Sequence, residues 1–566
     1  MSQTRQFDGN FSPILSTFES DLDCPLPSFA PLYSELAFFT MPAAPHLTIY
    51  DTTLRDGAQG EGVHFSLSDK LRLAERLASY GLHYVEGGWP GSNDKDRDFF
   101  SEAGKLHWGP CKLAAFGSTR RPSVEASADS QVKLLLEAET PVVTIFGKSW
   151  LLHVEKVLRT TPVENLRMIS DTIALLKKEG REAIYDAEHF FDGYSADSDY
   201  ALRTLEAATE AGADYLVLCD TNGGRLPSEI ATIVRTVRTR FPQTKVGIHT
   251  HNDCGLGVAN AVAAVQEGAL QVQGTMNGYG ERTGNCNLTT LLPLLELKLG
   301  KKVLPEGNLQ QLSELSAFVD ELANLHHDPR APFVGRTAFA HKGGMHVNAV
   351  NKIAASFEHI DPTSVGNHQR ILVGELSGGA NVMMKARELG IAVEEKSPQT
   401  RAILAKIKKL EKDGYEFEAA DASFELLVRR SLEKIPTPFL IESYKVEVVR
   451  ARPTARETSH ATISVRIGKK IQKTSAKGDG PVNALDAALR KALLPSFPSL
   501  RKMKLIDYKV RIVSSRGGTA ARIRVLVESS DGTREWGTVG VSTNILEASA
   551  LALTDSLSYF LLPRAG

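Results

Sequence analysis

The chain has 566 residues, of which 66 are Lys or Arg and 67 are Asp or Glu, so its formal net charge is only -1. This length predicts two to four domains. The balanced charge argues against nucleic acid or a membrane surface as a partner, and no apolar run approaches the ~18 residues that span a bilayer. Five widely spaced cysteines without a Cys-x-x-Cys pair indicate reduced thiols and a cytoplasmic location.

Residues 1–44 differ in composition from the rest of the chain. They are rich in Pro, Ser and Phe without periodicity, and their charges are mostly acidic. An organellar transit peptide is rich in Arg and poor in acidic residues, and a signal peptide has a basic start followed by an apolar run. Neither description fits, so we expect a disordered or loosely docked extension, with Met41 as an alternative start.

Between residues 45 and 305, short apolar stretches alternate with segments of helical periodicity. The expected strands span residues 47–51, 83–88, 111–117, 141–146, 182–187, 213–220, 244–249 and 269–276. The helical segments include residues 68–79, 163–178, 200–211, 228–240 and 256–266, and Ser66 and Pro227 provide start signals for two of them. Eight such units in about 250 residues predict a catalytic (β/α)8 TIM barrel, an α/β fold.

The barrel also predicts where a reaction takes place, because catalytic residues of this fold gather at the carboxyl ends of the strands. Polar side chains that periodicity does not explain follow those ends: Asp51, Arg55, Asp56, Glu86, Asp186, Glu188, Asp220, Thr221, His249, His251, Asn277, Glu281, Arg282 and Asn285. Their convergence on one rim indicates an enzyme.

Two histidines at the end of the seventh strand are the centre of this set. His249 and His251 are two positions apart, so both imidazoles face the same way and can bind one metal ion. Asp56 completes a set of two histidines and one carboxylate that leaves coordination positions open. The imidazoles suit Zn, Mn or Fe, while the carboxylate and a nearby amide such as Asn285 also suit Mg or Mn, so the divalent metal ion stays open.

A 2-oxo acid bound at such a metal would have its ketone polarised towards attack. Arg55 is placed to offset negative charge that grows on oxygen, and Glu188 is a candidate for proton transfer or water activation. Structural alternatives remain for some of these residues. Asp51 and Asp220 can cap the loops that follow their strands, and Arg55 can form a salt bridge at the barrel mouth.

Three motifs resemble the signatures of the DRE-TIM metallolyases: residues 51–57 (DTTLRDG), 249–253 (HTHND) and 280–285 (GERTGN). From residue 47 onward the chain is similar to the 2-isopropylmalate, homocitrate and citramalate synthases of that family, which are acyltransferases that condense acetyl-CoA with a 2-oxo acid. The resemblance implies that Asp56, His249 and His251 bind a divalent metal with Asn285 nearby. It further implies that Arg55 supports an enolate, Thr221 binds the substrate carboxylate and Glu188 performs the acid–base step.

Three further motifs resemble the citramalate synthase branch, which uses pyruvate and supplies isoleucine biosynthesis: residues 86–93 (EGGWPGSN), 188–194 (EHFFDGY) and 365–367 (VGN). Trp89, Phe116 and Phe146 near the strand ends would fill space that a larger substrate side chain needs. The alternatives are 2-isopropylmalate synthesis from 2-oxoisovalerate, an acyl-CoA lyase or aldolase, and a non-catalytic sensing scaffold.

Residues 306–435 are expected to form linker subdomains, with a helix over 308–324 and a segment rich in Gly and His around 340–348. The resemblance implies that this region reaches the active site of a partner subunit in a homodimer and that His346 is catalytic. A tyrosine that some relatives carry after the Val-Gly pair is missing, because Asn367 and His368 stand there.

Residues 400–429 read as helices, and Pro436 and Pro438 mark a domain boundary. Residues 436–566 contain a repeat: 444–449 (YKVEVV) recurs as 508–513 (YKVRIV), and 482–489 (VNALDAAL) recurs as 543–550 (TNILEASA). Each half predicts strands followed by a helix that an Asn begins, in a pseudo-symmetric α+β domain. A purely structural role in dimerisation is one interpretation of this domain. The resemblance instead implies an amino-acid effector site, for isoleucine if the product is citramalate and for leucine if it is isopropylmalate, with residues 478–483 and 537–544 as candidate loops.

Overall fold

Eight parallel strands close into a barrel in the computed structural model, which describes residues 46–372, 379–388, 390–391, 397–432, 435–450, 452, 457–513 and 521–562. The expected extension over residues 1–44 lies outside the described residues. The strands pair in sequence order, and the eighth pairs with the first. They are β1 (Thr48–Asp51), β2 (Tyr84–Gly88), β3 (Lys112–Ser118), β4 (Val142–Lys148), β5 (Glu182–Glu188), β6 (Tyr215–Asp220), β7 (Lys245–Thr250) and β8 (Gln271–Gly274). The predicted (β/α)8 barrel is confirmed.

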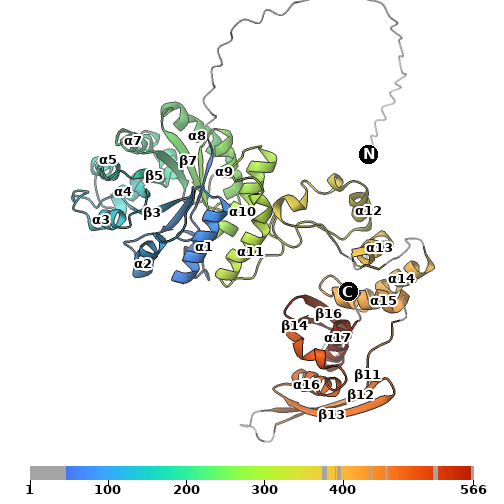
Figure 1. Ribbon diagram of the computed structural model, residues 1–566. Coiled ribbons are helices and arrows are strands. Elements are labelled where there is room, and N and C mark those ends of the chain that lie inside the picture. The colour runs from blue at the N-terminus through green and yellow to red at the C-terminus, as the bar shows by residue number, and fades with distance from the viewer. Residues whose placement is uncertain are drawn as a thin grey trace, which may run out of the picture. The chain divides into compact units, whose positions relative to one another are not determined.

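Helices surround the strands of the barrel (Figure 1). They are α1 (Leu67–Tyr80), α2 (Asp94–Ala103), α3 (Ser130–Glu137), α4 (Leu151–Lys156), α5 (Pro162–Lys178), α6 (Phe190–Ala196), α7 (Ser198–Glu210), α8 (Pro227–Arg240), α9 (Gly257–Gln266) and α10 (Leu288–Pro293). The predicted start signals are confirmed: the Ser66 side chain accepts a hydrogen bond from the backbone of Asp69 in a capping box, and Pro227 is the first residue of α8.

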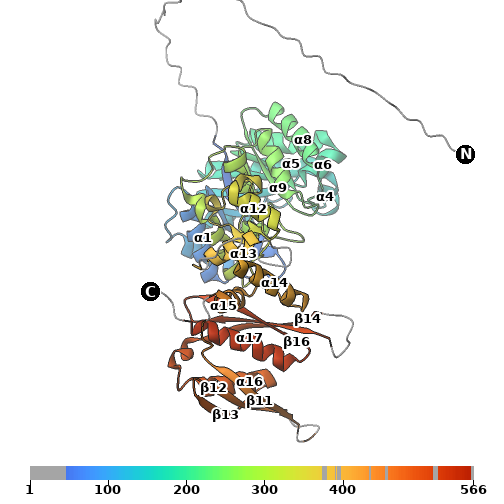
Figure 2. The same cartoon turned by 90° about the vertical axis from the view of Figure 1, so that its right-hand side faces the viewer.

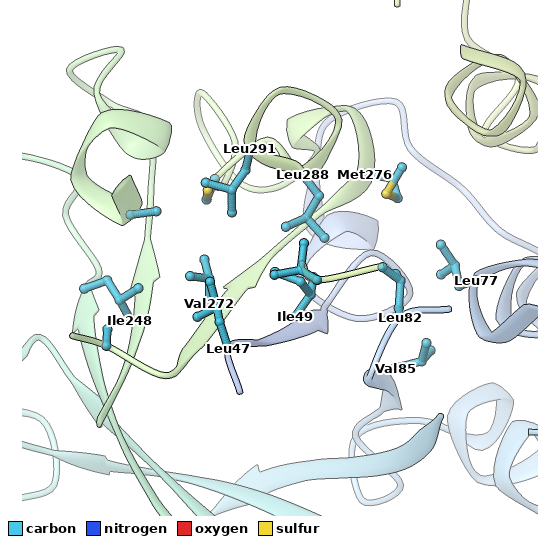
Figure 3. Close-up of a cluster of buried hydrophobic side chains, with 14 of the residues drawn as sticks. Leu47, Ile49, Leu77, Leu82, Val85, Ile248, Val272, Met276, Leu288 and Leu291 are labelled. Atoms are coloured by element: carbon cyan, nitrogen blue, oxygen red, sulfur yellow. The ribbon is translucent and has the colours of Figure 1, made fainter. Parts of the chain in front are cut away.

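The main core lies between the strands and the surrounding helices. In Figure 3, Ile49 and Val272 from neighbouring strands meet Leu288 and Leu291 from α10. A second, smaller cluster fills the inside of the barrel and includes Tyr50, Tyr84, Ile184, Tyr215 and Val217. Because the interior is packed with side chains, the space for a ligand is confined to one end of the barrel.

The segment after the barrel is tied to the loop that follows β8. It begins with the π-helix η3 (Leu294–Lys298), η4 (Asn308–Gln311) and α11 (Leu312–Leu322). Asp320 on α11 accepts hydrogen bonds from Asn277 Nδ2 at 2.8 Å and from the Tyr279 hydroxyl, and lies 2.6 Å from His327 Nδ1. The loop conformation therefore depends on α11 as well as on the barrel.

Short elements follow: β9 (Ala340–His341), α12 (Gly344–Lys352), η5 (Ala354–Ser356), η6 (Pro362–Val365), β10 (Arg370–Ile371), α13 (Gly379–Glu388), α14 (Pro398–Lys412) and α15 (Asp421–Leu432). The helices expected over 308–324 and 400–429 are confirmed, each as two pieces.

The predicted repeat forms two halves with the same order of elements, visible in Figure 2. The first contains β11 (Leu440–Val449), β12 (Thr458–Ile467), β13 (Lys470–Gly478) and α16 (Pro481–Leu493). The second contains η7 (Pro498–Lys502), β14 (Lys504–Ile512), β15 (Ile523–Ser530), β16 (Glu535–Ser542) and α17 (Ile545–Phe560). Each half is a three-stranded antiparallel sheet covered by its helix, and the halves share one core.

Two details of the repeat were predicted wrongly. Most of the expected loop over 537–544 belongs to β16, where Gly537 is required because a Cβ there would lie 2.0 Å from the Ala419 carbonyl oxygen. Asn483 does not begin α16, since the helix starts at Pro481 and Asn483 Oδ1 instead accepts from Asp479 N at 3.2 Å. Asn544 does cap α17, as predicted.

Four cysteines lie in the described part of the chain, Cys111, Cys219, Cys254 and Cys286, and all four are free thiols. None of the helices described here combines the length and hydrophobicity needed to cross a membrane.

Candidate active site

A cavity of about 250 Å³ opens at the carboxyl ends of the barrel strands. Side chains that the sequence predicted for the site line it: Arg55, Asp56, Asp186, Glu188, Thr221, His249, His251, Glu281 and Arg282. Glu86 lies deeper, fully buried on β2, and Asn277 is bonded to α11. Asp51 and Asp220 accept hydrogen bonds from the backbone of the loops that follow them, as their structural alternative predicts.

Asp56, His249 and His251 form a buried cluster whose facing atoms all lie within 4.8 Å of one another. His249 Nε2 is 3.4 Å from Asp56 Oδ2 and 3.3 Å from His251 Nε2. Alternation along the end of β7 places both rings on one side, and the loop after β1 brings Asp56 to them. The predicted juxtaposition of two imidazoles and a carboxylate is therefore present.

Asn285 lies next to one member of this cluster, His251. A β-bridge joins it to His251, and its Nδ2 donates to the Tyr279 carbonyl oxygen at 3.0 Å. Its Oδ1 is buried and has no hydrogen-bond partner among the described residues. A buried acceptor without a partner is costly, so the position of this amide oxygen next to His251 is compatible with a bound cation.

The electrostatics of the cluster also fit a cation. Burial alone would raise the pKa of Asp56, but the Arg55 guanidinium and the two imidazoles outweigh it and hold that pKa well below the usual range. Burial, together with the neighbouring His249, lowers the pKa of His251 to about 4. Burial would lower the pKa of His249, but the Asp56 carboxylate outweighs it and raises that pKa. At neutral pH the site thus offers a charged carboxylate at Asp56 and a neutral imidazole at His251, the forms that bind metals, whereas a cation would have to displace a proton from His249.

Arg55 lies between the cluster and a wall of aromatic rings. Its Nε donates to Glu86 Oε1 at 2.6 Å, its Nη1 lies 3.4 Å from Asp56 Oδ2, and its guanidinium stacks 3.7 Å from the centre of the Phe116 ring. Arg55 therefore forms salt bridges, as its structural alternative predicts, and its side chain also lines the cavity. Glu86 is in turn fixed by the Tyr50 hydroxyl at 2.7 Å.

Three aromatic residues, Trp89, Phe116 and Phe146, pack against one another and line one side of the cavity. Ring centres are 5.5 Å apart for Phe116 and Phe146 and 5.7 Å apart for Trp89 and Phe146. Asp96 Oδ2 accepts from the Trp89 backbone at 2.9 Å, and Lys70 Nζ, which is buried, lies 2.6 Å from Asp96 Oδ1. A buried ion pair thus fixes the turn that carries Trp89.

Glu188 and Thr221, which also line the cavity, end or follow neighbouring strands. Thr221 Oγ1 accepts from the backbone of His189 at 2.9 Å, and Glu188 contacts Lys148 Nζ. Lys148 was missed because the expected fourth strand ends at residue 146, whereas β4 continues to Lys148. Gln273 was also missed, although its inward position on β8 is a signal: a polar residue within an apolar strand.

His346, the remaining candidate, does not line the cavity. It lies exposed on α12, with its ring centre 4.3 Å from that of Phe357.

Three family models match consecutive parts of the chain. The HMGL-like model matches residues 46–319, the homocitrate synthase post-HMGL domain-like model matches residues 333–414, and the LeuA allosteric (dimerisation) domain matches residues 418–561. Together these models follow the order of barrel, linker elements and repeat.

Curated proteins match nearly the whole chain. An (R)-citramalate synthase of Aquifex aeolicus is 53% identical over 91% of this chain and 97% of its own length. An (R)-citramalate synthase of Geobacter sulfurreducens is 50% identical over 90% of this chain and 97% of its own length. A 2-isopropylmalate synthase of Methanocaldococcus jannaschii is more distant, at 29% identity over 91% of this chain and 95% of its length.

Proposed function

The chain belongs to the family of the (R)-citramalate synthases, and from this premise we propose that it condenses acetyl-CoA with pyruvate to (R)-citramalate and CoA. The observation that carries the proposal is the cavity in which Asp56, His249 and His251 face a wall of aromatic rings. Such a cavity combines residues that can hold a cation with room for a small 2-oxo acid.

Asp56, His249, His251 and Asn285 would hold a divalent cation, Mg, Mn or Zn. When bound, it supplies Lewis-acid polarisation of a substrate carbonyl. The donor set fits this role because it combines a charged carboxylate, imidazoles and an amide oxygen that has no partner among the described residues.

The protein's own groups account for the remaining tasks. The Glu188 carboxylate accepts a proton from the acetyl methyl group, and the electron pair of the broken C–H bond moves to the thioester oxygen. The Arg55 guanidinium, held by Glu86 and Phe116, stabilises the negative charge on that oxygen. The Thr221 side chain binds the carboxylate of the 2-oxo acid. The methylene carbon of the enolate then forms a C–C bond to the ketone carbon of pyruvate, and the ketone oxygen takes up the proton that Glu188 removed. Water next adds to the thioester carbonyl, the C–S bond breaks, and the sulfur leaves with a proton as CoA.

Substrate size is set by Trp89, Phe116 and Phe146. The rings line the side of the cavity next to Arg55, where they would exclude an isopropyl group and admit a methyl group. This favours pyruvate over 2-oxoisovalerate. Citramalate is a precursor for isoleucine, so we place the reaction early in isoleucine biosynthesis.

We propose four parts for the chain: an extension (1–44), the catalytic barrel (45–305), linker subdomains (306–435) and a regulatory domain (436–566). In a homodimer, His346 of one subunit reaches the cavity of the other. The exposure of His346 and Met345, the latter at 87%, supports this, because both side chains are accessible to a second copy. The regulatory domain binds an amino-acid effector, isoleucine for a citramalate-forming enzyme.

Release of CoA from acetyl-CoA tests the proposal, with Mg or Mn and with pyruvate, 2-oxoisovalerate or 2-oxoglutarate. A kcat/KM for pyruvate at least about tenfold above that for the other acids is expected, which is the scale on which a pocket discriminates small apolar groups. Preference for 2-oxoisovalerate would identify a 2-isopropylmalate synthase instead. No release with any acid would contradict a condensing enzyme altogether.

A further inference from the structure

Lys148 and Glu188 are the last residues of two neighbouring strands, β4 and β5, and they are partners in the register of the barrel. Lys148 Nζ contacts Glu188 Oε2. Their backbones are also fixed: Asn165 Nδ2 donates to the Lys148 carbonyl at 2.8 Å, and Ser149 N donates to the Glu188 carbonyl at 3.2 Å. The pairing therefore follows from the strand register, not from two mobile surface side chains that happen to meet.

The pair is largely withdrawn from solvent, with 13% of the Lys148 side chain and 24% of the Glu188 side chain exposed. The ammonium group lies 5.2 Å from the centre of the Phe146 ring, which lines the cavity. A charge pair in such surroundings interacts more strongly than a pair in water. The ammonium group thus sits where it acts on a carboxylate that faces the substrate cavity.

Lys148 is the only cation that forms an ion pair with Glu188 among the described residues. Arg55, the guanidinium at the aromatic wall of the cavity, is engaged by Glu86 and Asp56. Other titratable groups interact with the pair or lie next to it: Asp186 and His189 beside Glu188 along the chain, Cys219 on β6 and His153 on α4. None of these four groups supplies a permanent positive charge.

We propose that Lys148 is a positioning residue of this reaction, which holds the Glu188 carboxylate against the cavity. The inference rests on the proposed role of Glu188. In that step the C–H bond of the acetyl methyl group breaks, an O–H bond forms on Glu188, and the electron pair moves to the thioester oxygen. Without the ammonium group, the carboxylate loses its ion-pair partner and is free to rotate away from the cavity.

The test compares Lys148→Met with Lys148→Arg and with Lys112→Met as a matched control. Lys112 also lies on a strand beside an aromatic ring, 5.5 Å from the centre of Tyr84, and its Nζ lies 2.5 Å from Oε2 of Glu182 on β5. Unlike Lys148 and Glu188, Lys112 and Glu182 are the first residues of their strands, so they lie at the opposite end of the barrel. Steady-state kinetics are measured with acetyl-CoA and with acetyl-CoA deuterated in the methyl group.

Lys148→Met is expected to lower kcat about 100-fold, the usual scale for acid–base catalysis, while KM for pyruvate changes less than about threefold. The deuterium isotope effect on kcat should rise, because proton removal becomes slower than the later steps. The kcat of Lys148→Arg should be at least about tenfold above that of Lys148→Met, and the kcat of Lys112→Met should stay within about twofold of the parent value.

Glu188→Gln separates this inference from the role on which it rests. If Glu188→Gln is inactive but Lys148→Met keeps the parent kcat, the positioning role is wrong. If Glu188→Gln retains turnover, the role assigned to Glu188 is wrong instead. If Lys148→Met loses activity with an unchanged isotope effect, and Lys148→Arg gives no recovery, Lys148 merely supports the fold. Should Lys148→Met fail to fold, Lys148→Arg decides by its kcat and its isotope effect.

Discussion

Gln273 Oε1 lies 2.8 Å from His249 Nδ1, so this hydrogen bond places the ring proton on Nδ1 and leaves Nε2 free to face Asp56 and His251. Gln273 is itself fixed, because its Nε2 lies 2.9 Å from Asp186 Oδ1. Partners of this kind orient histidine ligands and set the nitrogen that binds the metal.

Gln273→Leu should therefore weaken binding of Mn²⁺ about 10- to 100-fold, measured by calorimetry on protein stripped with a chelator. Gln271→Leu is the matched control. Gln271 lies two residues earlier on β8, is equally buried, and neither of its side-chain amide atoms has a partner within the described residues. Its replacement should leave Mn²⁺ affinity unchanged. Equal affinity in both variants would contradict the orienting role of Gln273.

Trp89→Leu should shift the substrate preference towards larger 2-oxo acids. The indole ring closes the cavity against Phe116 and Phe146, and its loss opens room for a larger side chain. The ratio of kcat/KM for 2-oxoisovalerate to that for pyruvate should rise roughly 10- to 100-fold. Trp108→Leu, at an indole that donates to the Ala103 carbonyl and does not line this cavity, should leave the ratio unchanged.

Lys70→Met should destabilise the barrel by about 3–5 kcal/mol in urea unfolding, because Asp96 would remain as a buried charge without its cation. The same change should raise KM for pyruvate, since Asp96 also fixes the Trp89 backbone. Lys105→Met, which removes a surface pair with Glu102 whose lysine side chain is 70% exposed, should change stability by less than ~1 kcal/mol. A similar loss in both variants would show that burial of the Lys70 pair has no special effect.

The raised pKa of Asp51 predicts that the folded protein becomes less stable as the pH rises. Burial raises its pKa to about 7, although hydrogen bonds from Thr53 partly oppose this. The unfolded value is about 3.9, so between about pH 4 and pH 7 the folded protein retains a proton that the unfolded chain releases. Stability therefore falls as pH rises through this window and levels off on either side.

Asp51→Asn removes that dependence. The difference in free energy of unfolding between about pH 4.5 and pH 8 should shrink by on the order of 2–4 kcal/mol relative to the parent. Urea unfolding at the two pH values measures it, with Asp94→Asn, at a side chain 85% exposed, as control. An unchanged pH dependence would mean that Asp51 is ionised throughout the range.

The barrel was predictable because its strands are buried on both faces and read as apolar runs, and because parallel strands bring their ends to one rim. The pattern of apolar runs alone therefore places Arg55, Asp56, Glu188 and His249 together. Helices α3 and α4 were not predicted, since segments of eight and six residues hold too few turns for a clear period.

Other parts of the site depend on information that the sequence pattern lacks. Lys148 joins Glu188 only through the register of β4 and β5, and a strand end misplaced by two residues hides that pairing. Gln273 matters because of one hydrogen bond across neighbouring strands. The interior of β16 was mistaken for a loop because Gly537 and Gly540 resemble turn residues, whereas both allow a close backbone approach.

The hydrogen bonds that Asp320 accepts from Asn277 and Tyr279 make the eighth loop of the barrel depend on α11. The backbone carbonyl of Tyr279 also accepts the hydrogen bond that orients Asn285, so the position of this amide depends on a residue anchored on α11. A chain ended near residue 305 would keep all eight strands and still lack that anchor. A piece that keeps this loop in place therefore has to include α11 as well as the eight strands of the barrel.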